Sequence, residues 1–432
     1  MPDALWSGLA RPGRAVVPGF RARCGPGSGD IGSVPSLLGA ALYPVRVRDV
    51  VLLGSTGSIG SQTLEVIEAH PEKFRVIGLS AGGSQLDTLI AQAQAHRPDV
   101  VAVPTPAAAA ALEGRLPADT AIWTGPDASA RLAALPCDVV VNAITGAAGL
   151  EPTLAALAAG NALALANKES LVIGGELVTA AAAPGQILAV DSEHSAFAQA
   201  LRAGRSDEVR RLILTASGGP FRGRTRDELT DVTPEQALAH PTWSMGRIIT
   251  INSATLINKG LELLEAALLY GVDLDAIEVV VHPSSDVHSM VEFHDGSTIA
   301  QCSPPDMKLP IALALNWPER LPGASRPFDW SRPIDWHFEP LDSHAFPSVE
   351  LARRCGRAGG TAPAVYNAAN EICVDAFCER RLGFLGIVDT VTAVVDEHLA
   401  GAANQAPMSV DSVLDADAWA RRRAAELIGV AG

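Results

Sequence analysis

The sequence predicts an α/β protein with a Rossmann-like, doubly wound N-terminal domain, an α+β domain after it and a C-terminal helical bundle. Three observations support this class. From Val50 to Val190 short apolar runs alternate with helix-periodic segments, which is typical of a mostly parallel sheet. After residue 190 this rhythm changes and a hairpin appears, and from Ser348 onward the chain is Ala-rich with helical periodicity. With 432 residues, 48% of them hydrophobic, the chain is long enough for two or three cores.

The expected division runs by residue number. Residues 49–190 form the first domain, 191–318 the α+β domain, 319–347 a linker rich in Pro, Trp and Asp, and 348–432 the helical domain. Residues 1–48 are basic, poor in acids and rich in Gly and Pro, and they lack a continuous apolar run, which argues against a secretory signal. We expect a disordered tail or a start codon assigned too far upstream, in preference to a transit peptide.

The first domain is predicted to contain six strands with helices between them. Helices are expected at Ser61–Ala69 and Leu86–Ala95, among others. The expected strands are Val50–Leu53, Arg75–Leu79, Val100–Val103, Val139–Ala143, Ala162–Leu165 and Ile187–Val190.

The second domain is predicted to mix strands and one long helix. The helix is expected at Ala254–Tyr270, because its apolar residues recur at helical spacing. A hairpin is expected where two apolar runs flank the turn His294–Ser297. The expected strands are Leu212–Leu214, Ile248–Ile251, Ile277–Val281, Met290–Phe293 and Thr298–Gln301.

Composition limits the partners. The formal net charge of −15 disfavours a nucleic-acid partner, and no apolar run approaches the ~20 residues of a membrane span. The six cysteines are scattered without a C-x-x-C pair, so we expect reduced thiols and a cytoplasmic protein. The high Ala and Arg content is typical of a high-GC bacterium.

A glycine-rich turn predicts a dinucleotide site. Gly54, Gly57 and Gly60 follow the first strand and open a helix, in a variant of the Rossmann spacing whose free N–H groups suit a pyrophosphate. The end of the second strand, Ser80–Gln85, carries no acid for the ribose hydroxyls, which favours NADPH over NADH. It carries no arginine for a 2′-phosphate either.

Two further stretches bear carboxylates that suit a metal. Asp191 and Glu193 stand two apart at the end of a predicted strand, and Asn258 and Glu262 stand four apart on one helix face. Carboxylate oxygens without a His or Cys ligand pattern suit Mg²⁺ or Mn²⁺. Taken singly, Asp191–Glu193 is equally well explained as a helix N-terminus, and Glu262 as part of a solvated helix face.

Taken together, the motifs resemble the 1-deoxy-D-xylulose 5-phosphate reductoisomerase family, in order from about Val50 to about Leu399. The stretches that carry the resemblance are Gly54–Gly60, Asn167–Ser170, Val190–Ala196, Thr215–Phe221, His240–Gly246 and Asn252–Glu262.

The resemblance implies a role for each matching residue, with Lys168, Asp191, Glu193, His240 and Glu262 as the catalytic set. The implied metal ligands are Asp191, Glu193 and Glu262. The implied phosphate contacts are Ser217, Ser253, Asn258 and Lys259, and the implied contacts to the rest of the substrate are Lys168, Ser192, Glu193, His240, Trp243 and Glu262. The implied NADPH contacts are Thr56, Gly57, Ser58, Ile59, Gly82, Gln85, Asn167, Glu169 and Gly246.

The resemblance also implies the reaction. The enzyme would rearrange 1-deoxy-D-xylulose 5-phosphate, a step usually drawn as retro-aldol cleavage and re-addition. It would then reduce the rearranged product with NADPH to 2-C-methyl-D-erythritol 4-phosphate, a precursor in isoprenoid synthesis. It implies Mg²⁺ or Mn²⁺, with Co²⁺ as a further option, and a homodimer. Residues 191–318 would then be the catalytic domain, with a lid at 217–247 bounded by glycines and carrying Trp243.

Two positions depart from the family pattern, and two rival functions stay open. Gly83–Ser84 replaces a basic residue and Asn found in some members, and Asp286 stands where an apolar residue is expected. We expect His282, His288 and His294 to be structural rather than a metal site.

The first rival function is that of a metal-dependent, decarboxylating hydroxy-acid dehydrogenase, which would need an arginine cluster. The second is that of a catalytically silent NADP-binding regulator.

Overall fold

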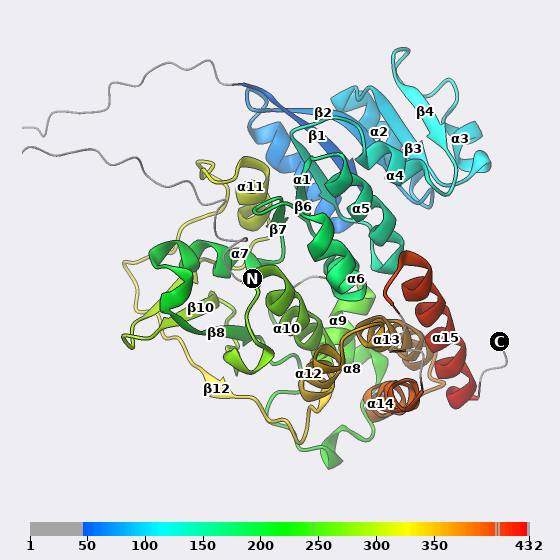
Figure 1. The fold of residues 1–432 in the computed structure, drawn as a ribbon. Helices are drawn as coiled ribbons and strands as arrows, with labels where there is room; N and C mark the ends of the chain where they lie inside the picture. The colour runs from blue at the N-terminus through cyan, green and yellow to red at the C-terminus, as the bar shows by residue number, and fades with distance from the viewer. Residues whose placement is uncertain (1–45, 244, 402–403, 405–406, 430–432) are drawn as a thin grey trace, which may run out of the picture.

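A computed structural model describes residues 46–429, apart from 244, 402–403 and 405–406 (Figure 1). The N-terminal extension predicted at residues 1–48 therefore lies almost wholly outside the described residues.

The first sheet has seven parallel strands in the order β4-β3-β2-β1-β5-β6-β7. The chain runs outward from β1 to β4 and then returns to place β5 beside β1, so the direction of winding switches between β1 and β5. The six predicted strands are confirmed, whereas β4 was not predicted because this edge strand is largely exposed and its apolar signal is weak. The strands are β1 (Arg48–Leu53), β2 (Phe74–Ser80), β3 (Val100–Val103), β4 (Ala121–Thr124), β5 (Val139–Asn142), β6 (Ala162–Leu165) and β7 (Ile187–Ala189).

Helices cover both faces of this sheet. Val50 and Leu52 of β1 belong to one core, and Val51 and Leu53 belong to the other, as the two-residue repeat of a strand requires. The first core contains α1 (Ser58–Ala69), α2 (Leu86–His96), α3 (Pro106–Leu112) and α11 (Lys308–Asn316), and the second contains α4 (Ala128–Ala133), α5 (Leu150–Ala158) and α6 (Lys168–Ala181). Helix α11 comes from inside the segment 191–318, yet it packs on the first sheet.

The second sheet has five strands in the order β11-β10-β8-β9-β12, and only β8 and β9 run parallel. The predicted hairpin is confirmed as β10 and β11. Strand β12 lies in the segment expected to be an irregular linker. The strands are β8 (Val209–Ala216), β9 (Ile277–Val281), β10 (Val287–Phe293), β11 (Thr298–Cys302) and β12 (Glu339–Pro340).

The strand predicted at Ile248–Ile251 is wrong, because these residues lie in α9 (Arg247–Ala254). Three isoleucines and a threonine favour a strand locally, but the Thr250 hydroxyl donates to the Gly246 carbonyl one turn back, and Ile251 is fully buried against the helical core. The helix predicted from Ala254 also begins later. Leu256 has a left-handed φ of 58°, which separates α9 from α10 (Ile257–Tyr270).

The C-terminal segment is helical, as predicted, but it has no core of its own. One continuous cluster joins Leu212 of β8 and Leu263 of α10 to Val365 and Phe377 of α13. Figure 1 shows these helices gathered at one end of the molecule, beside α10. The helices are α12 (Ser348–Ala358), α13 (Ala362–Cys378), α14 (Phe384–Ala400) and α15 (Val410–Ile428), and the shorter α7 (Ser192–Ala200) and α8 (Pro234–Leu238) lie earlier in the chain.

Candidate active site

A pocket opens where the carboxyl ends of the parallel strands face the mixed sheet and α10. It joins the start of α1, the end of β7, the end of β8 and one face of α10. Its lining includes Ser58, Ile59, Lys168, Asp191, Ser192, Glu193, Ser217, His240, Trp243, Gly246, Ser253, Asn258, Lys259 and Glu262, all of which the sequence indicated.

The glycine turn lies at one rim of this pocket. Gly54 has a φ of 76°, and a Cβ there would stand 2.5 Å from the Ala143 carbonyl oxygen, so only glycine fits. A Cβ on Gly60 would collide with the turn's own backbone. Helix α1 begins after Gly57 without a side-chain cap or a first-turn acid. Its first N–H groups are therefore available to an anion.

Three carboxylates meet in the same pocket. Asp191 follows β7 and caps α7, Glu193 lies in the first turn of α7, and Glu262 lies on α10. One ligand atom from each lies within 4.8 Å of the others. Burial and the nearby Glu262 carboxylate raise the pKa of Glu193 to about 7. Close carboxylate oxygens with a like-charge penalty are a donor set that fits a hard divalent cation.

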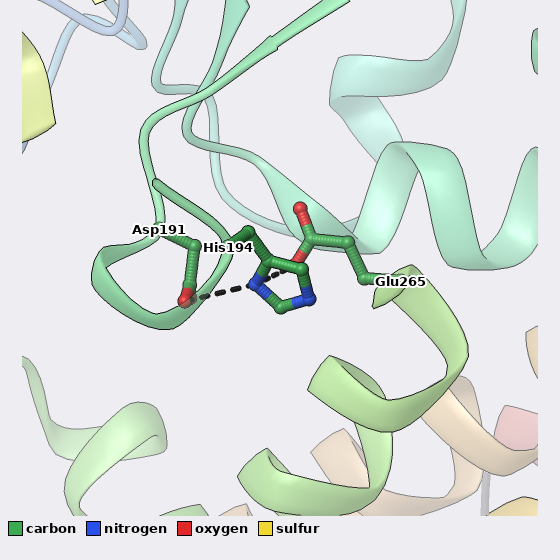
Figure 2. A group of neighbouring side chains, drawn as sticks. All are labelled: Asp191, His194 and Glu265. Carbon is green, nitrogen blue, oxygen red and sulfur yellow. Dashed lines mark hydrogen bonds and ion pairs between the residues drawn. The ribbon is translucent and has the colours of Figure 1, made fainter. Parts of the chain in front are cut away.

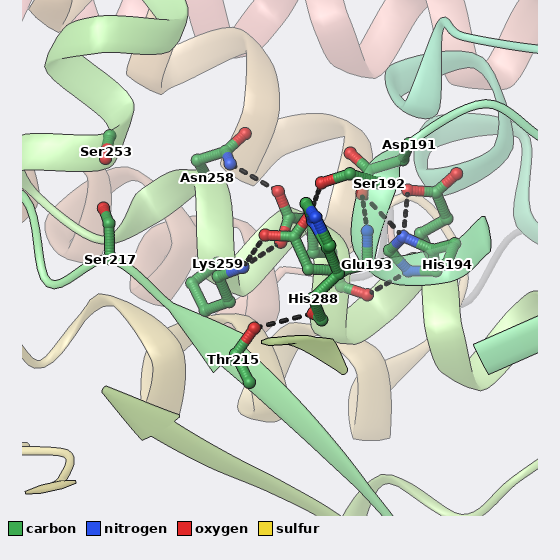
Figure 3. A network of polar contacts seen from close by, with 12 residues as sticks. Asp191, Ser192, Glu193, His194, Thr215, Ser217, Ser253, Asn258, Lys259 and His288 are labelled. Carbon is green, nitrogen blue, oxygen red and sulfur yellow. Dashed lines mark hydrogen bonds and ion pairs between the residues drawn. The ribbon is translucent and has the colours of Figure 1, made fainter. Parts of the chain in front are cut away.

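Two lysines, Lys168 and Lys259, stand among these acids, and Figure 3 shows Lys259 beside them. Lys168 Nζ lies 2.5 Å from an Asp191 oxygen and 2.8 Å from a Glu262 oxygen, and Lys259 Nζ lies 2.8 Å from a Glu193 oxygen. Burial lowers the pKa of Lys168, but the charges of Asp191 and Glu262 outweigh burial and raise it well above its usual range. The charges of Glu193 and Glu262 likewise outweigh burial and raise the pKa of Lys259. Both ammonium groups therefore stay charged, and they offset part of the negative charge of the three acids.

His240 faces two serines across the pocket. Its Nδ1 accepts the backbone N–H groups of Thr242 and Trp243, at 3.1 and 2.9 Å. The proton of a neutral ring must then reside on Nε2, which lies 3.1 Å from both the Ser217 and Ser253 hydroxyl oxygens. Burial lowers the pKa of His240, which favours this neutral form. The result is a cluster of hydrogen-bond donors suited to phosphate oxygens.

Some residues expected at the cofactor site do not line the pocket. Gly82 and Gln85 are exposed after β2. The Asn167 amide donates to the Ile144 and Gly146 carbonyls, and its oxygen accepts from the Ser170 N–H, so this side chain holds the loop after β5 and caps α6. Thr56, Gly57 and Glu169 flank pocket residues without lining it.

The pocket also contains residues that sequence reasoning missed, among them Thr215, His288 and Met307. His288 was expected to be structural. It is buried, its pKa is lowered by burial to about 4, and its ring centroid lies 6.4 Å from that of Trp243. His282 approaches the His337 carbonyl and His294 is exposed, so these histidines do not form a ligand set among the described residues.

A Rossmann-like sheet whose glycine turn opens onto a buried cluster of carboxylates defines a nucleotide-dependent, metal-assisted oxidoreductase. Three family profiles match the chain: 1-deoxy-D-xylulose 5-phosphate reductoisomerase over residues 50–175, the C-terminal domain of that enzyme over residues 187–270, and the DXP reductoisomerase C-terminal domain over residues 302–423. The chain belongs to the 1-deoxy-D-xylulose 5-phosphate reductoisomerase family.

Individual relatives agree with this assignment. The reductoisomerase of Cutibacterium acnes is 63% identical over 400 residues, which cover 88% of this chain and 98% of that protein. A crystal structure of DOX-P reductoisomerase in complex with NADPH, fosmidomycin and magnesium is 37% identical with a TM-score of 0.83, over 89% of this chain and 98% of the other. The Zymomonas mobilis enzyme in complex with NADPH is 40% identical, with a TM-score of 0.82, over 89% of this chain and 99% of the other.

This chain is therefore an enzyme of isoprenoid-precursor synthesis. It converts 1-deoxy-D-xylulose 5-phosphate to 2-C-methyl-D-erythritol 4-phosphate with NADPH and a divalent metal.

Proposed function

We propose that this one pocket carries out both the rearrangement and the reduction, with its opposite ends assigned to metal and phosphate. Asp191, Glu193 and Glu262 would hold one Mg²⁺ or Mn²⁺, with Co²⁺ as a substitute. The observation that carries the proposal is the meeting of these acids, with ligand atoms within 4.8 Å, in a pocket that Ser58 of the nucleotide turn also lines.

The fit of a divalent ion rests on the donor set. All three groups are carboxylates, and Glu262 is only 2% exposed, so the like-charge penalty among them is large unless cations are near. When bound, the ion supplies Lewis-acid polarisation of the substrate carbonyl and its neighbouring oxygen.

Helix α10 sets the distance between the two ends of the substrate. Asn258 and Lys259 lie one turn or less from Glu262 on the same helix, so a short phosphorylated ketose can span both. Ser217, Ser253 and the Nε2–H of His240 supply further donors at the phosphate end. Once the carbon–carbon bond is cleaved, only one fragment carries the phosphate. The phosphate contacts would hold that fragment, and the metal end of the pocket would hold the other fragment through its two oxygens, so that re-addition takes place between positioned partners.

The remaining groups act near the reacting carbons. Lys168 and Ser192 stand beside the acids, where the Lys168 ammonium stabilises negative charge that develops on the substrate oxygens. Trp243, Met245 and His288 line the wall of the pocket and limit access of water. The NADPH pyrophosphate would meet the N-terminus of α1, and the nicotinamide would enter beside Ile59 and Met307.

The lining of the pocket also bears on the rival functions. Within the part of the chain that the structure describes, no arginine lines this pocket, whereas a hydroxy-acid dehydrogenase would need such residues for a dicarboxylate. A silent NADP-binding regulator leaves the clustered carboxylates unexplained.

The test is the carbon connectivity of the product. The purified protein is incubated with NADPH, Mg²⁺ and ¹³C-labelled 1-deoxy-D-xylulose 5-phosphate, and the product is analysed by NMR. A branched tetritol phosphate that forms only when both metal and NADPH are present is the expected result. An unbranched pentitol phosphate, or no turnover, would contradict the proposal.

We also propose a cytoplasmic homodimer. The membership of the family supports both points, and in the described residues no helix combines the length and apolar character of a membrane span. Light scattering coupled to gel filtration should give twice the 44.9 kDa mass of the chain.

A further inference from the structure

Glu265 is a buried acid with no role in the mechanism above. It lies on α10 three residues after Glu262, its side chain is 0% exposed, and neither carboxylate oxygen has a hydrogen-bond partner among the described residues. Its nearest cationic partner is His194, whose Nδ1 lies 3.4 Å away (Figure 2). A carboxylate in such surroundings is costly to bury, so its retention calls for an explanation.

His194 connects Glu265 to two metal ligands. Its Nδ1 lies 3.1 Å from Asp191 Oδ1, and its Nε2 lies 2.9 Å from the backbone oxygen of Glu262. A carbonyl oxygen can only accept, so Nε2 carries a hydrogen and donates it. Nδ1 then faces two carboxylates, and a proton must lie between the ring and these acids. The imidazole is therefore locked in one orientation by acceptors on both sides.

These contacts join the two elements that bring the metal ligands together. Asp191 and His194 belong to the start of α7, whereas Glu262 and Glu265 belong to α10. The Tyr270 hydroxyl, at the end of α10, also donates to the His194 carbonyl at 2.5 Å. While Asp191 Oδ1 faces His194, its Oδ2 faces the pocket and Lys168.

We propose that Glu265 is a positioning residue for the metal site. Through His194 it holds the Asp191 carboxylate with one oxygen turned inward and the other toward the ion, and it fixes the spacing of α7 against α10. The inference rests on the proposed metal site and extends it to an acid that does not touch the ion. Partners of ligating carboxylates commonly change metal affinity by tenfold or more.

A second metal ion at Asp191, His194 and Glu265 is a competing explanation, because their ligand atoms also lie within 4.8 Å of one another. The hydrogen-bond pattern disfavours it, since an ion would have to displace the proton that Nδ1 shares with the acids. His194 and Glu265 are also fully enclosed. The measured number of ions per chain separates the two explanations.

The test compares Glu265→Gln with the parent by Mn²⁺ binding, using calorimetry and the loss of the free Mn²⁺ EPR signal. We expect one ion per chain in the parent, and in the variant a dissociation constant raised about tenfold. The KM for metal should rise while kcat at saturating metal is largely kept. NADPH affinity, measured by fluorescence, should be unchanged. The metal-free variant should melt below the parent, because His194 loses one of its two acidic partners, but it should remain folded at the assay temperature because Asp191 still pairs with the ring.

Glu350→Gln, on the exposed first turn of α12, is the matched control and should behave as the parent. If Glu265→Gln does not fold, Glu265→Met keeps the volume without the polar group and should show the same loss of metal affinity. A variant with parental metal affinity, or two ions per chain in the parent, would overturn the inference while leaving the proposed function intact. A parent that binds no metal and shows no turnover would instead overturn the proposed function.

Discussion

Asp191 contacts several of the residues that form the proposed metal site. It caps α7, faces His194 with one oxygen and faces Lys168 with the other. Asp191→Asn keeps the shape and most of these contacts but removes one ligand charge. We expect metal affinity to fall by two orders of magnitude or more, with turnover lost at ordinary metal concentrations. Isothermal titration with Mn²⁺ measures this directly.

The control for this substitution is Asp207→Asn, an exposed acid of the same type. It should leave metal binding and turnover unchanged. NADPH affinity should persist in both variants, because neither residue belongs to the glycine turn at the start of α1. Unchanged metal affinity in Asp191→Asn would mean that Asp191 is not a ligand.

Lys259 should have opposite effects on metal and substrate. Its ammonium stands between Glu193 and Glu262, so Lys259→Met removes a cation that repels the metal, and metal affinity should rise. The same change removes a charge-assisted contact to phosphate, worth about 1.5–3 kcal/mol, so substrate KM should rise roughly 10- to 100-fold. Steady-state kinetics at saturating metal measures the second effect. General damage to the site would weaken the binding of both metal and substrate. That outcome would refute the assignment of Lys259 to the substrate phosphate.

At this scale the sequence predicted the residues whose spacing alone places them together. Asn258 and Glu262 lie on one helix, as their spacing predicted, whereas Lys259 was indicated by the family resemblance. Asp191 and Glu193 were expected at the end of a strand, but they lie at the cap and in the first turn of α7, which was the alternative explanation of this motif. Met307 and His288 reach the pocket through tertiary packing from distant segments, and no local pattern could indicate that. Glu265 had a usable signal, because it interrupts the otherwise apolar run 263–269 of α10, where an acid is unusual.

At the scale of elements, strands were predicted well where both faces are buried, and less well elsewhere. Helix α9 was mistaken for a strand because β-branched residues dominate its sequence, whereas packing against the helical core decides its structure. The helical conformation of α9 matters for the site, because Gly246 and Ser253 lie near its two ends and both line the pocket.

The segment 217–247 leads into α9 and remains our proposed lid. Near the start of this segment, Gly218 and Gly219 have φ values of 81° and 63°. Near its end, Trp243 lines the pocket. A phosphonate hydroxamate that mimics the substrate should change the fluorescence of Trp243 on closure. The difference between the parent and Trp243→Phe isolates this signal from the other six of the chain's seven tryptophans. An identical ligand-induced change in both proteins would refute a moving Trp243.

At the scale of the whole molecule, the sequence predicted the fold class but not how its parts share their cores. Local periodicity indicates helices and strands, but it does not indicate which helix packs against which sheet. Helix α11 therefore packs on the first sheet although it begins about 120 residues after β7, the last strand of that sheet, and the C-terminal helices extend the core of the mixed sheet. The division at residues 190, 318 and 347 remains a prediction about folding units.

A shortened chain tests where the fold begins. Strand β1 begins at Arg48, the family match begins at residue 50, and the Cutibacterium acnes relative is matched over 98% of its length by 88% of this chain. Among the contacts of the described residues, a protein that begins at Val47 loses the ion pair of Arg46 with Asp138. Arg46 is 83% exposed in this pair, so we expect a cost below about 1 kcal/mol.

Arg48 provides the contrast, because its guanidinium donates to the Leu315 and Trp317 carbonyls, at 3.0 and 3.2 Å, and ties β1 to the end of α11. Arg48→Ala in the shortened chain should lower the free energy of unfolding by about 2 kcal/mol, since two partly buried carbonyls lose a charged donor. Thermal melts and turnover of the full chain, the Val47 chain and the Arg48→Ala chain provide the measurement. The first two should agree and the third should melt several degrees lower. A shortened chain that melts or turns over far below the full one would mean that residues 1–46 contribute to the folded enzyme.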